Sequence, residues 1–116
     1  MTPEIFISKL GTPETIDFQD TMAVINEHFS YVPTAFTNGL SDKRVANEAG
    51  KNEGSCKIFA FAHLFALDNE QTLRCFGTFY QDVLNTPEGD DHGNIRNFIR
   101  DGWEGIRFEG QALTRK

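Results

Sequence analysis

Residues 50–67 read GKNEGSCKIFAFAHLFAL, a polar loop with two glycines that runs into the most apolar segment of the chain. From Ile58 to Leu67, only His63 interrupts the apolar residues. A helix that is apolar on nearly every side is enclosed by its neighbours in a core. This segment is too short for a membrane span, which needs about 20 apolar residues. The stretch therefore predicts a central helix over residues 55–67.

Two helices are predicted before the central one, and both begin with the same signal. Thr2-Pro3-Glu4 and Thr12-Pro13-Glu14 each place a threonine before a proline and an acidic residue, the order that is typical of a helix start. The first helix is expected to end at Leu10. The second is expected to run to about Ser30, with one apolar face formed by Phe18, Met22, Ile25 and Phe29.

Two more helices are predicted after the central one, each with one apolar face. The first begins at Asp68 or Asn69 and buries Leu73, Phe76, Tyr80 and Val83. The second follows Asp91 or His92 and buries Ile95, Phe98 and Ile99, before the glycines that flank Trp103 end it.

Strand-like residues are few. Residues 32–37 and 105–109 predict a small two-stranded antiparallel sheet, with Pro33 confining the first strand to an edge. Asn38-Gly39 is a turn dipeptide, but no matched strand follows at once, so residues 40–55 are expected to form a long loop, a kind that is often functional. Residues 111–116 are expected to fray. The predicted fold is α+β, with about five helices around the central helix and this two-stranded sheet.

Length and charge limit the possible functions. A chain of 116 residues predicts a single domain over residues 1–116. The net charge of −6 argues against nucleic acid and anionic membrane surfaces as partners. The chain has no basic and apolar leader of the secretory kind. Its two cysteines make no disulfide framework, which favours reduced thiols and a cytoplasmic location.

Cys56 is the first candidate for chemistry. It is predicted to lie in the first turn of the central helix beside Lys57, where the helix dipole lowers the pKa of a thiol. His92 is the candidate base, with the aspartate Asp91, or else Asn94, orienting its ring. A thiol-dependent enzyme is one hypothesis. The alternative is that Cys56 packs as a small buried apolar residue.

The same helix start is a candidate anion site. Backbone N–H groups at Gly50, Gly54 and Ser55 can face an anion, with Lys57 nearby. The order of residues differs from that of a phosphate-binding P-loop, which excludes that motif. Capping by Ser55 is the alternative role for this segment.

We expect the polar loops 38–55 and 88–94 to converge beside Cys56, because each precedes a helix N-terminus. No metal site and no cofactor are expected, since the histidines and cysteines lack metal-ligand spacing. The main hypothesis is a module that binds a small anionic ligand or a partner protein. Its candidate binding residues are Asn38, Asn47, Asn52, Ser55, Lys57, Asn94 and Trp103.

Long motifs resemble the HopJ family of type III effector-like proteins. They are the run from Asn47 to Ala62 with its glycines and Ser55-Cys56-Lys57, the run from Cys75 to Leu84, the run from Pro87 to Arg96, and Gly102-Trp103-x-Gly105-Ile106. The resemblance implies no established activity and no catalytic residue. It implies one alternative location, a host cell reached by type III secretion, with a host protein as partner. The two capped helices at the start favour a resident cytoplasmic protein instead.

Overall fold

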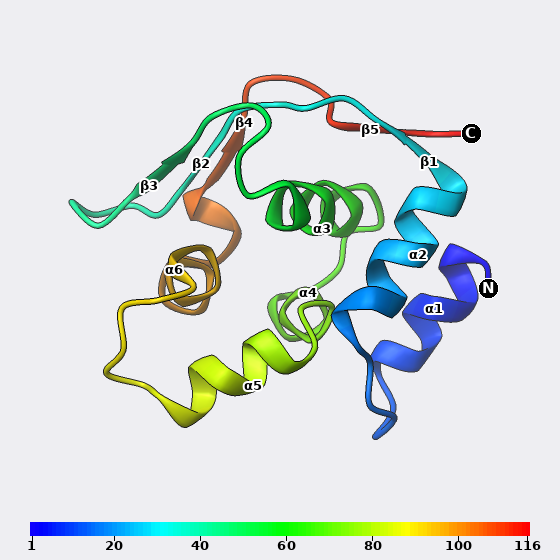
Figure 1. The fold of residues 1–116 in the computed structure, drawn as a ribbon, viewed down its shortest axis with the longest axis horizontal. Helices are drawn as coiled ribbons and strands as arrows, with labels where there is room; N and C mark the ends of the chain where they lie inside the picture. Colours follow the sequence, from blue (N-terminus) through cyan, green and yellow to red (C-terminus); the bar gives the residue numbers. More distant parts are fainter.

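The computed structural model describes all 116 residues, and six α-helices dominate it (Figure 1). No helix is both long and apolar enough to cross a membrane. The helices are α1 (Pro3–Leu10), α2 (Phe18–His28), α3 (Glu53–Leu64), α4 (Asn69–Arg74), α5 (Thr78–Asn85) and α6 (Gly93–Asp101). The other elements are β1 (Phe29–Tyr31), β2 (Phe36–Asn38), β3 (Val45–Asn47), the 3-10 helix η1 (Gly102–Gly105), β4 (Ile106–Phe108) and β5 (Leu113–Arg115).

Helix α3 lies at the centre of the fold, as predicted. Figure 1 shows α1 and α2 on one side of it, α6 on the other, α4 and α5 below and the strands above. The helix begins two residues earlier than predicted and ends at Leu64 instead of Leu67. The chain leaves the helix because Ala66 takes a left-handed conformation, with φ at 52°, and the Leu67 N–H donates to the Ala62 carbonyl at 2.9 Å.

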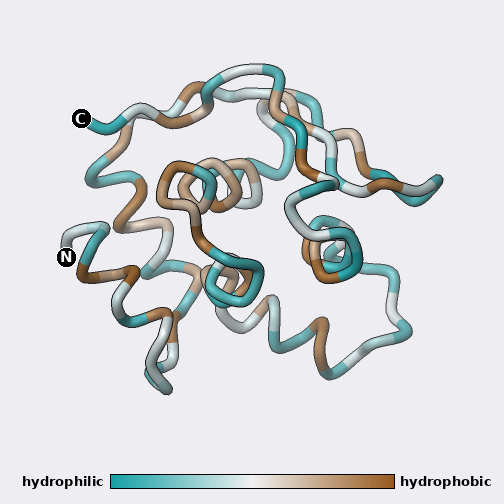
Figure 2. Tube along the Cα trace, turned by 180° about the vertical axis from the view of Figure 1, so that it is seen from behind, coloured by the Kyte–Doolittle hydropathy of each residue, from teal (hydrophilic) through white to brown (hydrophobic).

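Two phenylalanines on opposite sides of α3 hold the layers together. Phe59 and Phe61 are both fully buried, and successive positions on a helix are about 100° apart, so residues two apart point in opposed directions. The Phe59 ring contacts Phe36, Phe76, Phe98 and Trp103, at centroid distances of 5.9, 5.5, 5.1 and 6.3 Å. The Phe61 ring contacts Phe6, Phe29 and Phe65 on the other side, at 5.9, 5.7 and 5.0 Å. Apolar residues accordingly line the inward faces of the surrounding elements (Figure 2).

The start of the second helix differs from the prediction. Residues 12–17 are irregular, and α2 begins at Phe18 with a capping box between Asp17 and Asp20. Arg74 of α4 donates hydrogen bonds to the Leu10 and Glu14 carbonyls, which holds this segment outside a helix. The proline and threonine signal was therefore overridden by a tertiary contact from 60 residues away in the sequence.

The single helix predicted after Asp68 is two helices, α4 and α5. The chain turns at Gly77, which has a φ of +60°. A side chain there would also place its Cβ 2.6 Å from the Phe18 backbone nitrogen. Only glycine fits this approach, since it has no Cβ and tolerates a positive φ. The start of α2 therefore packs directly onto the break between α4 and α5.

The strands form one bent antiparallel ribbon. β2 pairs with β4, which confirms the direction of the predicted sheet, and β1 pairs with β5. One register continues between the two pairs, where Val32 N–H donates to the Ala112 carbonyl at 2.8 Å and Glu109 N–H to the Ala35 carbonyl at 3.0 Å. The fraying predicted for residues 111–116 is wrong, because β5 is held by β1.

The long loop predicted over residues 40–55 is partly wrong as well. Val45–Asn47 forms β3, which pairs with the other edge of β2 and makes a three-stranded sheet in the order β3-β2-β4. Three residues are too few to show an alternating pattern in the sequence, so β3 is defined by its partner and not by its composition.

We expect Phe59→Ala to lower the free energy of unfolding by about 3–5 kcal/mol, because the cavity it leaves borders four aromatic rings that cannot all move in. Urea unfolding followed by circular dichroism measures this. Phe79→Ala is the matched control, since Phe79 is 39% exposed, and we expect it to cost about 1 kcal/mol or less. Equal losses for the two variants would contradict the central role of Phe59.

Candidate functional site

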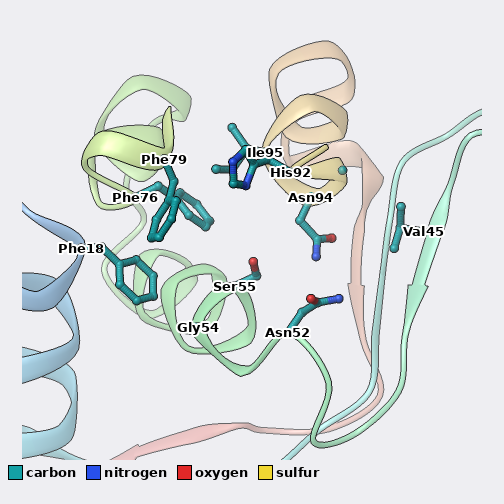
Figure 3. A pocket seen from close by; sticks show the side chains of 11 residues that line it. Phe18, Val45, Asn52, Gly54, Ser55, Phe76, Phe79, His92, Asn94 and Ile95 are labelled. Carbon is teal, nitrogen blue, oxygen red and sulfur yellow. The ribbon is translucent and has the colours of Figure 1, made fainter. Parts of the chain in front are cut away.

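The two polar loops converge, as predicted, on one cavity of about 390 Å³ (Figure 3). It lies where the N-terminal ends of α3 and α6 meet, with the start of α2, the α4–α5 break and β3 completing its walls. The lining residues are Phe18, Val45, Asn52, Gly54, Ser55, Phe76, Phe79, His92, Gly93, Asn94 and Ile95.

Both helix ends at the cavity lack side-chain caps. Asn52 and His92 occupy the capping positions of α3 and α6, each in a left-handed conformation with φ near 50°, and neither side chain accepts a hydrogen bond from its helix. The first intrahelical donors are the N–H groups of Cys56 and Arg96. The N–H groups before them, at residues 53–55 and 93–95, have no intrahelical acceptor. Two positive helix ends therefore face one space.

One wall of the cavity is apolar. The Phe18 and Phe79 rings meet edge to face at 5.2 Å, and Phe79 packs against the His92 ring at 5.5 Å. Gly54 permits this wall, because a Cβ at this position would lie 2.6 Å from the tip of the Phe18 ring. Ile95 and Phe76 complete the wall. The cavity thus combines backbone donors on one side with aromatic surface on the other.

Asparagine side chains tie the two helix ends together. Asn47 of β3 exchanges two side-chain hydrogen bonds with Asn94 of α6, at 3.1 and 2.9 Å, and its Oδ1 also accepts from Asn52 Nδ2 at 2.7 Å. Asn38 Nδ2 donates to the Asn94 carbonyl and to its Oδ1, at 2.8 and 3.0 Å. We call Asn38, Asn47, Asn52 and Asn94 the amide cluster. It fixes the separation of the two helix ends.

The predicted binding residues divide into three groups. Asn52, Ser55 and Asn94 line the cavity, and Ser55 points into it (Figure 3). Asn38 and Asn47 are 0% and 3% exposed and lie behind this lining, where they can support the site but do not open onto it. Lys57 and Trp103 lie elsewhere.

Lys57 and Trp103 face other parts of the molecule. Lys57 Nζ donates to Asn26 Oδ1 at 3.0 Å and lies 4.8 Å from the centre of the Tyr31 ring. Trp103 Nε1 donates to the Leu67 carbonyl at 3.0 Å. The Trp103 ring lines a second, more apolar cavity of about 630 Å³ beside His63 and β4. The expectation that Lys57 adds positive charge to the helix-start site is therefore wrong.

The structure does not make Cys56 a reactive thiol. Its side chain is 1% exposed, does not line the cavity, and donates from Sγ to the Thr34 carbonyl at 3.5 Å. Burial is the main cause that raises the pKa of the Cys56 thiol above its ordinary value, with Glu53 adding to the effect. The predicted lowering of this pKa is wrong, because burial outweighs the opposing effects of Lys57 and of hydrogen bonding.

Asp91 and His92 are neighbours in space as well as in sequence. His92 Nε2 lies 3.7 Å from Asp91 Oδ2, but the closer partner of Asp91 is Arg96, at 2.7 Å. Hydrogen bonding from Arg96 is the main cause that lowers the pKa of the exposed Asp91 carboxyl. His92 packs on Phe79 and is not brought to Cys56. No group of three or more His, Cys, Asp or Glu side chains is arranged to hold a metal ion.

Comparison with known proteins identifies the family. The family model described as HopJ type III effector protein matches residues 4–113. The chain belongs to the HopJ family. A crystal structure titled unknown function protein VPA0580 is similar to this HopJ chain with 55% sequence identity and a TM-score of 0.90, covering 97% of this chain and 92% of that one. No curated protein matches.

The family assignment confirms the resemblance seen in the motifs. The match begins at Glu4 in α1 and ends at Leu113, the first residue of β5. The solved relative has no stated function. Chemical roles for the cavity of this HopJ chain must therefore be argued from its own geometry.

Sequence reasoning missed the aromatic wall. Phe18 and Phe76 were assigned to the buried faces of their helices, and both do pack inward, but their ring edges also border the cavity. The available signal was the sequence position of Phe79, which falls beside the apolar face of α5 and not on it. Nothing in the sequence indicated Val45 as a lining residue, because strand β3 was not predicted.

We expect Asn47→Ala to lower the free energy of unfolding by about 2–4 kcal/mol, because it leaves the side-chain amides of Asn52 and Asn94 without their acceptor. Asn26→Ala is the control. Asn26 is exposed, its side chain accepts a hydrogen bond from Lys57 Nζ, and Lys116 Nζ donates to its backbone carbonyl, which alanine retains, so we expect a change within about 0.5 kcal/mol. Urea unfolding measures both. A loss at Asn47 no greater than that at Asn26 would contradict a structural role for the amide cluster.

We expect Cys56 to react slowly with iodoacetamide in the native protein. Because its pKa is raised, less thiolate is present at any pH from 7 to about 9 than in an ordinary cysteine of pKa about 8.5. The alkylation rate against pH, read by mass spectrometry of the Cys56 peptide, measures this, with the urea-unfolded chain as reference. A native rate at pH 7 that equals or exceeds the unfolded rate would refute the assignment.

Proposed function

We propose that this HopJ protein is a binding module for a small ligand that carries a carboxylate or phosphate next to an apolar group. The ligand would occupy the cavity between the N-terminal ends of α3 and α6. The observation that supports this most is the convergence of two uncapped helix ends on one space. The N–H groups of a helix N-terminus and its dipole together favour negative charge.

The charges of the lining agree with this proposal. None of the lining residues is Asp, Glu, Lys or Arg, and His92 is the one that can gain a positive charge. The nearby carboxyl of Asp91 is paired with Arg96. An anionic group in the cavity would therefore be met by backbone donors, by Ser55 and Asn52, and by His92 when it is protonated.

The apolar wall further limits which chemical groups of a ligand fit the cavity. A volume of about 390 Å³ falls in the range of about 300–1,000 Å³ that is typical of small-ligand sites, which combine apolar surface with a few polar groups. The edge-to-face pair of Phe18 and Phe79 offers ring surface to an aromatic or branched group. The same chemistry is presented by an aromatic acid, an aryl phosphate or the C-terminal residue of a partner peptide.

The test titrates benzoate, phenyl phosphate and N-acetylphenylalanine into ¹⁵N-labelled protein, with uncharged benzamide for comparison. We expect the amide signals of Gly54, Ser55 and Gly93 to shift for at least one of the anions and not for benzamide. We also expect the binding anion to raise the thermal midpoint, as mass action requires.

Two variants that add the same charge distinguish an effect at the cavity from a general effect of added charge. Ser55→Asp puts a carboxylate in the cavity at the start of α3, where the helix dipole favours it, and we expect it to weaken binding of the anion by at least about tenfold. Ser41→Asp adds the same charge on an exposed loop and should leave the affinity unchanged. No shift with any of the three anions, or equal affinities for the two variants, would overturn the proposal.

A further inference from the structure

Asn38-Gly39 lies at the end of β2 and is the only Asn-Gly dipeptide in the sequence. The proposed binding function gives it no chemical role. Asparagine followed by glycine is the dipeptide most prone to spontaneous deamidation, because glycine does not hinder the approach of its own backbone nitrogen to the preceding side chain. The dipeptide is therefore a reactive sequence placed inside the protein.

The reaction needs only water. The Gly39 backbone nitrogen attacks Cγ of Asn38, a new C–N bond closes a succinimide ring, and the side-chain amide nitrogen leaves as ammonia. Water then opens the ring at either of its two carbonyls. The product is aspartate where the side-chain carbonyl is hydrolysed, and isoaspartate where the backbone carbonyl is hydrolysed.

The folded structure blocks each of these events. The Gly39 N–H donates to the Gly105 carbonyl at 2.9 Å, so the attacking nitrogen is engaged in the sheet. The leaving amide of Asn38 donates to the Asn94 carbonyl and Oδ1, at 2.8 and 3.0 Å. Asn38 is 0% exposed, which keeps water away.

We infer that Asn38-Gly39 is a deamidation site that the β2–β4 pairing and the amide cluster hold unreactive, so that only a chain that has unfolded is modified. The geometry that protects it is the pair of contacts on its two reacting nitrogens, to Gly105 and to Asn94.

The modification is incompatible with the native contacts. A carboxylate at position 38 would face two acceptors, the Asn94 carbonyl and Oδ1, and the present Asn38 Oδ1 already has no hydrogen-bond donor. Burying a charge without a partner is strongly unfavourable. Isoaspartate would add a backbone atom to β2 and shift its register with β3 and β4. A modified chain therefore cannot regain the native state, and the reaction makes unfolding irreversible.

The test follows Asn38 in the wild-type chain at pH 7.5 and 37 °C, in buffer and in urea. Peptide mapping detects the replacement of NH₂ by OH and the isoaspartate product. We expect Asn38 to react first among the asparagines in urea, and to react more than about a hundredfold more slowly in buffer, since the reaction must wait for opening. A native rate within about tenfold of the unfolded rate, or another asparagine reacting faster in urea, would overturn the inference.

Two variants test whether the contacts protect the site. Asn94→Ala removes the Oδ1 acceptor from Asn38, while Ile25→Val weakens the core on α2, away from the amide cluster. They are compared at equal free energies of unfolding, set with urea. We expect faster native deamidation of Asn38 in Asn94→Ala. Equal rates in the two variants would show that the contacts with Asn94 do not protect the site.

Discussion

Enclosure of the middle of α3, around Phe59 and Phe61, is the constraint from which the rest of this structure follows. Phe59 and Phe61 point to opposite sides of one short helix, and each must find apolar partners away from water. Phe61 draws α1 and β1 to one side, and Phe59 draws β2, the α4–α5 segment and α6 to the other. A helix with a single apolar face would require only one of these layers.

This enclosure also decides where the polar groups of α3 can go. The middle of the helix is buried, its N-terminal end opens onto the cavity, and α6 begins at the same cavity, with Phe98 packed on Phe59. Hydrogen bonds within the amide cluster then join the buried side chains of Asn47 and Asn94 to each other and to the exposed Asn52. Two positive helix ends are thus held together by packing and amide contacts, with no lysine or arginine in the lining.

The sequence predicted the helices well and the strands poorly. Helical periodicity repeats over several turns in residues 18–29, so the signal accumulates there, whereas the periodicity over residues 73–83 did not reveal the break at Gly77. The strands have three residues each, and β3 and β5 exist because β2 and β1 supply their partners. The prediction of the candidate site likewise succeeded for local patterns and failed for contacts between distant segments. Glycines and asparagines in the sequence indicated the polar loops. Which side chains line the cavity depends instead on which helix faces pack together.

The sequence by itself determined a central apolar helix, an α+β fold, two polar loops before helix starts and membership of the HopJ family, because each rests on a local pattern or a contiguous motif. Tertiary structure alone decided that Cys56 is buried with a raised pKa, that Lys57 and Trp103 face away from the cavity, and that Phe18 and Phe79 form its wall. Adjacent positions on a helix point about 100° apart, so Ser55 opens onto the cavity and Cys56 does not. Which of the two faces the solvent depends on how neighbouring elements pack, and no local pattern contains that information.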